Sequence, residues 1–330
     1  MNKDRKILGF LMILVVIFIV INLSSLAQQK TVELKIGTSQ PPGHPQVVAC
    51  EMAADTIFEK TNGRIKVSVF PSSQLGGSKD MVQSTMMGTQ EMIIESAGLF
   101  AAAFPRISVF DAPYIVRDLK HGLNMFKSPI GQEILKEFSD KLGVRILSAF
   151  YYGTRHITSN RPIYSLSDMK GFKLRVPEQK ISVDWVKAIG GTPTPMAFAE
   201  VYLALKTGVI DGQENPLVTI DTQKFYEVQD YLNMTSHQVA LLLCCINENI
   251  YQSLSPEDKE IVASAFEEAA NYNNALMVEL EDSMLKKLED AGMEVIRPDL
   301  EPFIKASQTI YTEFEDTWGK GTWEALWDVD

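Results

Sequence analysis

A helical pattern of unusual length lies near the C-terminal end of the sequence. Ser255 offers an N-cap side chain, Pro256 stands at the first helical position, and Asp258 stands at the third. No helix-breaking residue follows before Ala291, which predicts a helix of about 35 residues and roughly 50 Å. Helices of this length are unusual inside one globular domain, so we expect an element that spans two lobes. A coiled coil is the alternative, but Ala, Tyr and Asn occupy too many apolar positions for a sustained heptad.

Strands and helices alternate in the first third of the chain. Residues 32–36 and 65–70 alternate apolar and polar side chains, as half-buried strands do. Between them, residues 47–61 have helical periodicity until Asn62-Gly63 ends it. A helix over 79–87 and a short apolar strand over 92–94 follow. This alternation predicts an α/β domain with a largely parallel sheet.

The α/β pattern continues after a helical stretch over residues 119–142. Residues 144–152 predict a strand that could carry the chain from one domain into the next. The further predicted elements are a capping box over 165–168 that opens a short helix, strands over 172–176, 209–211 and 236–246, and a helix over 198–206.

The N-terminus has the features of an export signal. Lys3, Arg5 and Lys6 form a basic start, an apolar run covers residues 7–21, and Ser25-Leu26-Ala27 is a small-residue site. This order predicts a secretory signal peptide over residues 1–27. An uncleaved membrane anchor is the alternative, because the run approaches the roughly 17–25 residues that span a bilayer. In both cases the folded part, from about Gln28, lies outside the cytoplasm.

Charge and reactive side chains exclude several classes of function. A net charge of −11 argues against nucleic-acid binding, which needs a basic surface, but not against a small anionic ligand. The 330 residues suffice for two domains. The three cysteines are an odd number, and Cys244 and Cys245 lie in an apolar run, so we interpret them as core residues. The four histidines are far apart in sequence, so we expect no metal site.

The sequence offers little support for an enzyme. It contains no glycine loop of the kind that holds phosphate and no nucleophile elbow. Glu95 and the segment 211–214 supply carboxylates, but their spacing alone assigns no acid–base pair. We therefore expect a binding protein rather than a catalyst.

A series of short motifs fills the middle of the chain. In order they are Gly153-Thr154-Arg155, Thr158 to Ile163, Asp168 to Pro177, Thr192 to Phe198, Glu200 to Leu205, Asp211 to Pro216, Phe225 to Val228, and Thr235 to His237. Their order and spacing resemble those of the solute-binding proteins of TRAP transporters, the tripartite ATP-independent periplasmic systems. The resemblance covers the whole exported chain and is strongest to the branch that binds sialic acid and other sugar acids.

The resemblance implies an α/β, two-lobed fold of the periplasmic-binding-protein type, with a long helix that spans both lobes. Lobe I is expected over residues 29–152 and 241–280, and lobe II over 153–240 and 281–330. The lobes would close over the ligand by a hinge motion. The implied partners are a small carboxylate ligand and the membrane subunits of a TRAP transporter, the implied location is the periplasm, and no cofactor is expected.

Arg175 is the first site residue that the resemblance implies. It lies late in a predicted strand, and ligands bind at strand ends in open α/β sheets. In the family an arginine at this place forms a two-pronged salt bridge with the ligand carboxylate, for which the planar guanidinium is suited. By the same resemblance Arg155 is a second arginine on the carboxylate side, Asn215 is a donor and acceptor, and Phe198 packs on the ligand.

The remaining implied positions concern the far end of the ligand. Glu95 and His237 match positions that reach polar groups in the sugar-acid branch. Sialic-acid binders carry an Asn and a Ser-rich turn where this chain has residues 38–44, and an acidic residue at the place of Gly77. In that loop Gln40, His44 and Thr38 are candidates for ligand contacts.

These differences from sialic-acid binders do not change the expectation that the ligand is an acid, but they leave its exact identity open. A sugar acid such as a hexuronate or a sialic acid is the leading expectation. C4-dicarboxylates and other 2-hydroxy or 2-keto acids are the alternative, as is a sensor that reports ligand to a signalling receptor.

Overall fold

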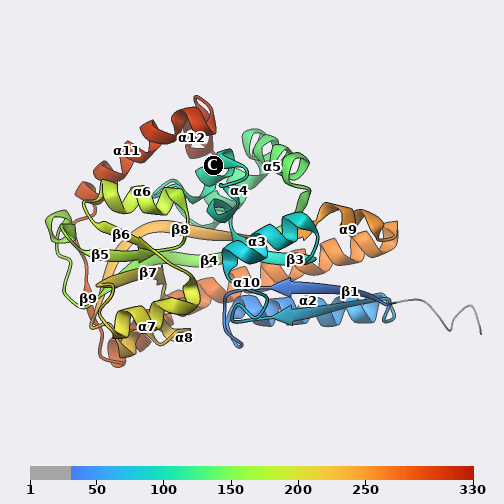
Figure 1. The fold of residues 1–330 in the computed structure, drawn as a ribbon, viewed down its shortest axis with the longest axis horizontal. Helices are drawn as coiled ribbons and strands as arrows, with labels where there is room; N and C mark the ends of the chain where they lie inside the picture. The colour runs from blue at the N-terminus through green and yellow to red at the C-terminus, as the bar shows by residue number, and fades with distance from the viewer. Residues whose placement is uncertain (1–30) are drawn as a thin grey trace, which may run out of the picture.

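The computed structural model describes residues 31–330, which form two α/β lobes on a continuous mixed sheet (Figure 1). The strand order is β2-β1-β3-β8-β4-β7-β5-β6, and β9 pairs with β8. The strands are β1 (Val32–Gly37), β2 (Ile65–Phe70), β3 (Met92–Ser96), β4 (Val144–Ser159), β5 (Lys173–Val176), β6 (Thr192–Pro195), β7 (Gly212–Pro216), β8 (Tyr231–Asn247) and β9 (Glu294–Ile296).

Helices cover both faces of the sheet. The α-helices are α2 (Pro45–Lys60), α3 (Ser78–Met87), α4 (Leu119–Lys127), α5 (Pro129–Leu142), α6 (Lys180–Ala188), α7 (Val201–Lys206), α8 (Leu217–Thr222), α9 (Glu248–Ser253), α10 (Pro256–Asp290), α11 (Glu301–Trp318) and α12 (Thr322–Trp327). Short 3₁₀ helices are η1 (Ala97–Phe100), η2 (Pro105–Asp111), η3 (Leu166–Met169), η4 (Phe198–Glu200) and η5 (Phe225–Glu227). No helix within residues 31–330 combines the length and apolar character that a membrane crossing needs. The predicted signal peptide lies outside the described residues.

Two long strands join the lobes. β4 and β8 pair antiparallel along nearly their whole length, from Val144 opposite Asn247 to Ser159 opposite Tyr231. In lobe I β8 also pairs with β3, and in lobe II β4 also pairs with β7. Both strands are longer than predicted, because their extensions carry buried polar side chains that the apolar pattern does not include. The parallel pairing predicted for the first lobe is confirmed for β1, β2 and β3, whereas the crossing strands are antiparallel.

The pairing of the crossing strands is irregular close to the expected lobe boundary. Tyr151 lies opposite Leu241, and Gly153 lies opposite Ala240, with a bulge between them. A cut after residue 152 in β4 and after residue 240 in β8 therefore falls at the same place in the ladder. We propose this level as the boundary between lobe I (29–152 and 241–280) and lobe II (153–240 and 281–330).

The long predicted helix is confirmed as α10, which ends one residue earlier than expected. Its first turn is capped by Ser255 Oγ, which accepts a hydrogen bond from Asp258 N at 3.1 Å. The helix contacts α2, β4 and α8, and it runs along both lobes beneath the sheet (Figure 1). Asn274 Oδ1 accepts a hydrogen bond from Tyr151 N at 2.6 Å, and Asn273 Nδ2 donates to Tyr151 O at 2.8 Å. The asparagines that argued against a coiled coil thus hold the crossing strand.

Two predicted elements differ in the structure. The helical stretch over 119–142 is two helices, because Pro129 lacks the backbone N–H that would continue α4, and Ser128 Oγ accepts from Gly131 N to cap α5. The strand predicted over 209–211 lies instead at 212–216, where every side chain is buried although most are polar. Cys244 and Cys245 are buried and free, which confirms their interpretation as core residues, and Cys50 is also buried and free.

Candidate functional site

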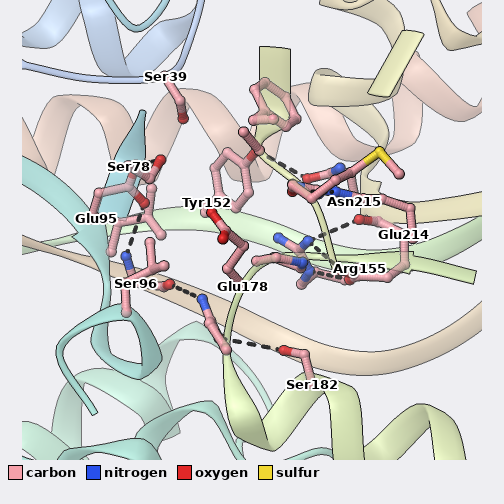
Figure 2. Close-up of a pocket in the computed structure, with 18 of the residues that line it drawn as sticks. Ser39, Ser78, Glu95, Ser96, Tyr152, Arg155, Glu178, Ser182, Glu214 and Asn215 are labelled. Atoms are coloured by element: carbon pink, nitrogen blue, oxygen red, sulfur yellow. Dashed lines mark hydrogen bonds and ion pairs between the residues drawn. The ribbon is translucent and has the colours of Figure 1, made fainter. Parts of the chain in front are cut away.

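A pocket lies between the two lobes, next to the crossing strands (Figure 2). The carboxyl ends of the parallel strands β5 and β7 reach it from lobe II, where Arg175 pairs with Gln213. The pocket is lined by Ser39, Gln40, Ser78, Glu95, Ser96 and Leu99 of lobe I, by Tyr152, Arg155, Gln238 and Leu242 of the crossing strands, and by Arg175, Pro177, Glu178, Gln179, Ser182, Met196, Ala197, Phe198, Glu214 and Asn215 of lobe II.

Arg175 is a buried cation without an acidic partner. Its side chain is held by the Met196 carbonyl, to which Nη2 and Nε donate at 2.7 and 3.2 Å, and by the Phe198 ring, whose centroid lies 5.7 Å from Cζ. The residue is 3% exposed. Among the side chains that the structure describes, no carboxylate forms an ion pair with it, and burial lowers its pKa to about 10. A buried guanidinium in this state binds an anion favourably, because the anion supplies the missing counter-charge.

Arg155 has a different electrostatic environment. Its Nη2 donates to Glu214 Oε1 at 2.8 Å and its Nε donates to Glu214 Oε2 at 2.5 Å, so the two side chains form a bidentate buried pair. His237 Nε2 lies 3.1 Å from the same Oε2. Burial alone would raise the pKa of Glu214, but the charge of Arg155 and the hydrogen bonds from His237 and Arg155 lower it to about 2. The charge of Arg155 is therefore already neutralised within the protein.

A chain of hydrogen bonds connects the lobes behind the pocket. Gln40 Nε2 of lobe I donates to the Tyr152 hydroxyl at 3.0 Å, and this hydroxyl donates to Asn215 Oδ1 at 3.1 Å. Asn215 Nδ2 then donates to Gln213 Oε1 at 2.5 Å. Gly153 makes the arrangement possible: its φ is +112°, and a Cβ there would lie 2.8 Å from Pro216 Cβ.

Glu95 supplies a carboxylate from the end of β3. Ser78 Oγ donates to it, and the Ser96 backbone N–H lies 3.4 Å from its Oε2. Burial raises the pKa of Glu95 to about 7, although the hydrogen bond from Ser78 and the charge of Arg175 oppose the shift. Near neutral pH this group can therefore donate as well as accept a hydrogen bond.

The lobes also touch directly beside the pocket. Gln179 Nε2, at the start of α6, donates to Ser96 Oγ at 2.5 Å. The same side chain lies against Gly98, where an added Cβ would lie 2.5 Å from Gln179 Oε1 and 2.9 Å from Asp111 Oδ2. A larger residue at position 98 would therefore displace the Gln179 and Asp111 side chains from these positions.

Six of the nine predicted site residues line this pocket: Arg175, Arg155, Asn215, Phe198, Glu95 and Gln40. The structure places the other three outside the lining. Thr38 Oγ1 accepts from Gln46 Nε2, and His44 caps α2 by accepting from Gln46 N through Nδ1. His237 stacks on Trp185, with 4.1 Å between ring centroids, and orients Glu214. A direct ligand contact by these three stays a prediction, and each supports a neighbour of the pocket.

Several lining residues are absent from the sequence-based prediction. Tyr152 immediately precedes the Gly-Thr-Arg motif, and Glu178 and Gln179 follow the strand that carries Arg175. Their closeness in sequence to those motifs could have identified them as candidate site residues. Ser39 and Ser96 are likewise next to predicted site residues, whereas Ser78 carries no such signal, because only the packing of α3 against β3 places it at the pocket. Within residues 31–330 no three His, Cys, Asp or Glu side chains are grouped as metal ligands.

The sequence matches a known family over most of its length. The model of the bacterial extracellular solute-binding proteins, family 7, matches residues 36–317. A curated relative from Vibrio cholerae, the sialic acid-binding periplasmic protein SiaP, is 40% identical over 287 residues, which are 87% of this chain and 89% of that protein.

Solved structures share the fold. A TRAP periplasmic solute-binding protein from Roseobacter denitrificans, with bound 3-deoxy-D-manno-oct-2-ulosonic acid, has a TM-score of 0.87 at 31% identity and covers 91% of this chain and all of that chain. A second, from Xanthobacter autotrophicus with bound β-D-galacturonate, has a TM-score of 0.85 at 31% identity, covering 90% of this chain and all of that chain. The chain therefore belongs to family 7 of the bacterial extracellular solute-binding proteins, the solute-binding component of TRAP transporters.

Proposed function

We propose that this protein captures a sugar acid outside the cytoplasmic membrane and delivers it to the membrane subunits of a TRAP transporter. Arg175 takes the ligand carboxylate in a two-pronged salt bridge. Export depends on residues 1–27 as a signal peptide, and the protein works as a carrier without catalysis.

The observation that carries this proposal is the contrast between the two arginines of the pocket. Arg155 is paired with Glu214, whereas Arg175 is equally buried and bonds only to a backbone carbonyl and an aromatic ring. Removing a charge from water is unfavourable unless a counter-charge compensates it. A ligand carboxylate supplies that compensation, and it does so fully once the lobes exclude water.

The rest of the pocket fits a polyhydroxylated molecule. Its other polar groups include the amides of Gln40, Gln179, Gln238 and Asn215 and the hydroxyls of Ser39, Ser78 and Ser96. Hydroxyl groups of a sugar can donate to and accept from such side chains. Phe198 offers an aromatic surface beside Arg175 against which a sugar ring can pack. The sugar acids bound by the three related proteins agree with this reading.

Thermal unfolding of the mature protein, from about Gln28, tests the proposal. The panel contains hexuronates, sialic acid, short dicarboxylates, 2-keto acids and matched neutral sugars. A ligand at 100 times its dissociation constant adds about 2.7 kcal/mol, which raises the Tm of a protein of this size by several degrees. We expect shifts with sugar acids and none with neutral sugars.

Other outcomes separate the alternatives. A Tm shift with dicarboxylates or short keto acids alone would show that the ligand belongs to that class and would leave the family assignment unchanged. Binding without uptake, when the protein is combined with its membrane subunits in vesicles, would favour the sensor role.

A further inference from the structure

Two carboxylates converge at the first turn of α3, on the lobe I side of the pocket. Ser78 Oγ donates to Glu95, and the next residue, Lys79, places Nζ 3.9 Å from Glu178 Oε1. Glu178 belongs to lobe II, two residues after the end of β5, and its side chain is directed into the pocket (Figure 2). Consecutive residues of one helix therefore hold an acidic group from each lobe.

The guanidinium of Arg175 is anchored by groups other than these two carboxylates, although its charge acts on both. Met196 and Phe198 hold it against β6 and η4 in lobe II. Because Arg155 and Glu214 neutralise each other, the charged groups left among the described side chains that line the pocket are one cation, Arg175, and two acidic groups, Glu95 and Glu178. Lys79 does not reverse this balance, because its side chain is 55% exposed at the mouth and already faces Glu178.

We propose that Glu178, together with Glu95, restricts the pocket to acids that carry a single carboxylate and present hydroxyl groups at the opposite end. The proposal rests on the proposed function, because it assumes that Arg175 holds the first carboxylate. Under this proposal the pocket binds sugar monoacids more tightly than diacids of the same carbon skeleton.

The chemistry of the two ends gives the reason. A carboxylate oxygen accepts hydrogen bonds, so a sugar hydroxyl is a suitable partner for Glu178. A second ligand carboxylate has no proton to offer and is repelled by the like charge. Because the Glu178 side chain is 39% exposed, water screens part of this repulsion, and one such charge pair at about 6 Å changes affinity by roughly tenfold. Lys79, exposed to solvent and shared with Glu178, offsets little of that repulsion.

Calorimetric titration with matched acids tests the proposal. The ligands are three pairs, glucuronate with glucarate, galacturonate with galactarate, and mannuronate with mannarate. In each pair the aldarate carries a second carboxylate in place of the C1 aldehyde that closes the uronate ring. The ring form is the same for every protein tested, so comparing the uronate-to-aldarate ratio between variants isolates the effect of the second carboxylate on Glu178. The proteins are the wild type, Glu178→Gln and the control Glu268→Gln. The control also removes an exposed carboxylate from a lysine pair, Lys60–Glu268 at 3.8 Å, but Glu268 lies on α10 and does not line the pocket.

We expect the wild type and Glu268→Gln to bind the preferred uronate at least tenfold more tightly than its aldarate. In Glu178→Gln this ratio should fall by about tenfold, mainly through tighter aldarate binding. An aldarate that binds the wild type as tightly as the uronate would overturn the proposal. So would an unchanged ratio in Glu178→Gln, and in both cases the sugar-acid function would stand. Absence of binding by every uronate, every aldarate and sialic acid, with binding of an acid that is not a sugar acid, would instead refute the proposed function itself.

Discussion

Replacement of Arg175 by Gln should affect ligand binding and ligand-free stability in different ways. The side chain is buried, no described carboxylate forms an ion pair with it, and burial lowers its pKa from 12.5 to about 10. At 1.36 kcal/mol per pKa unit, this corresponds to an unfavourable burial of about 3 kcal/mol. Its removal also breaks the two hydrogen bonds to the Met196 carbonyl, at a cost of about 1–3 kcal/mol. The ligand-free variant should therefore be as stable as the wild type, or more stable by up to about 2 kcal/mol.

The same substitution should nearly abolish binding. A ligand carboxylate that enters the closed pocket would lose its charged, two-pronged partner, and such losses amount to about 2–5 kcal/mol. We expect at least a 30-fold weaker affinity for the preferred sugar acid. Urea unfolding of the ligand-free proteins measures the first effect, and calorimetric titration measures the second.

Arg155→Gln is the matched comparison. It removes the same type of side chain from the same pocket, but it leaves Glu214 as a buried carboxylate without its main partner. Breaking a buried pair in this way costs about 3–5 kcal/mol of stability. If Arg175→Gln lost as much stability as Arg155→Gln and kept wild-type affinity, the reasoning that assigns the ligand carboxylate to Arg175 would be refuted.

Three further predictions concern other parts of the pocket. The pKa of Glu95 is raised from 4.5 to about 7, so the folded state binds the extra proton between these values and stability should fall as pH rises through this window. Glu95→Gln should remove that fall and stabilise the protein by up to about 3 kcal/mol at pH 8, as measured by urea unfolding at pH 5 and 8; an unchanged pH dependence would contradict the shift. Phe198→Ala should weaken binding by about 1–3 kcal/mol and leave the preference for acids over neutral sugars intact; a switch to neutral sugars in the thermal-shift panel would show that Phe198 has another role. Gln179→Ala removes a hydrogen bond between the lobes, to Ser96, and should weaken ligand affinity by about 1 kcal/mol through faster dissociation; stopped-flow release that matches the wild type would exclude this contact from closure.

Local pattern predicted the elements with strong periodicity or clear caps. The alternating residues of β2 and the capped start of α10 lie where the sequence indicates, because these features act over a few neighbouring residues. The same reasoning failed for β7, whose Gly-Gln-Glu-Asn-Pro sequence has no apolar alternation. Its polar side chains are satisfied by partners on β4, β8 and the opposite lobe, and these partners are distant in sequence.

The sequence alone determined the family, the compartment expected from the first 27 residues, and the position of Arg175 at a strand end near the pocket. These depend on motifs and on short-range chemistry. Only the tertiary structure decided the state of each charge, because that state depends on what packs beside it. Arg155 and Arg175 both lie in strands. In the folded protein Arg155 forms an ion pair with Glu214, whereas Arg175 bonds to the Met196 carbonyl and keeps its charge available for a ligand. In the same way, the packing of α3 brings Glu95 and Glu178, 83 residues apart in sequence, to one side of the pocket.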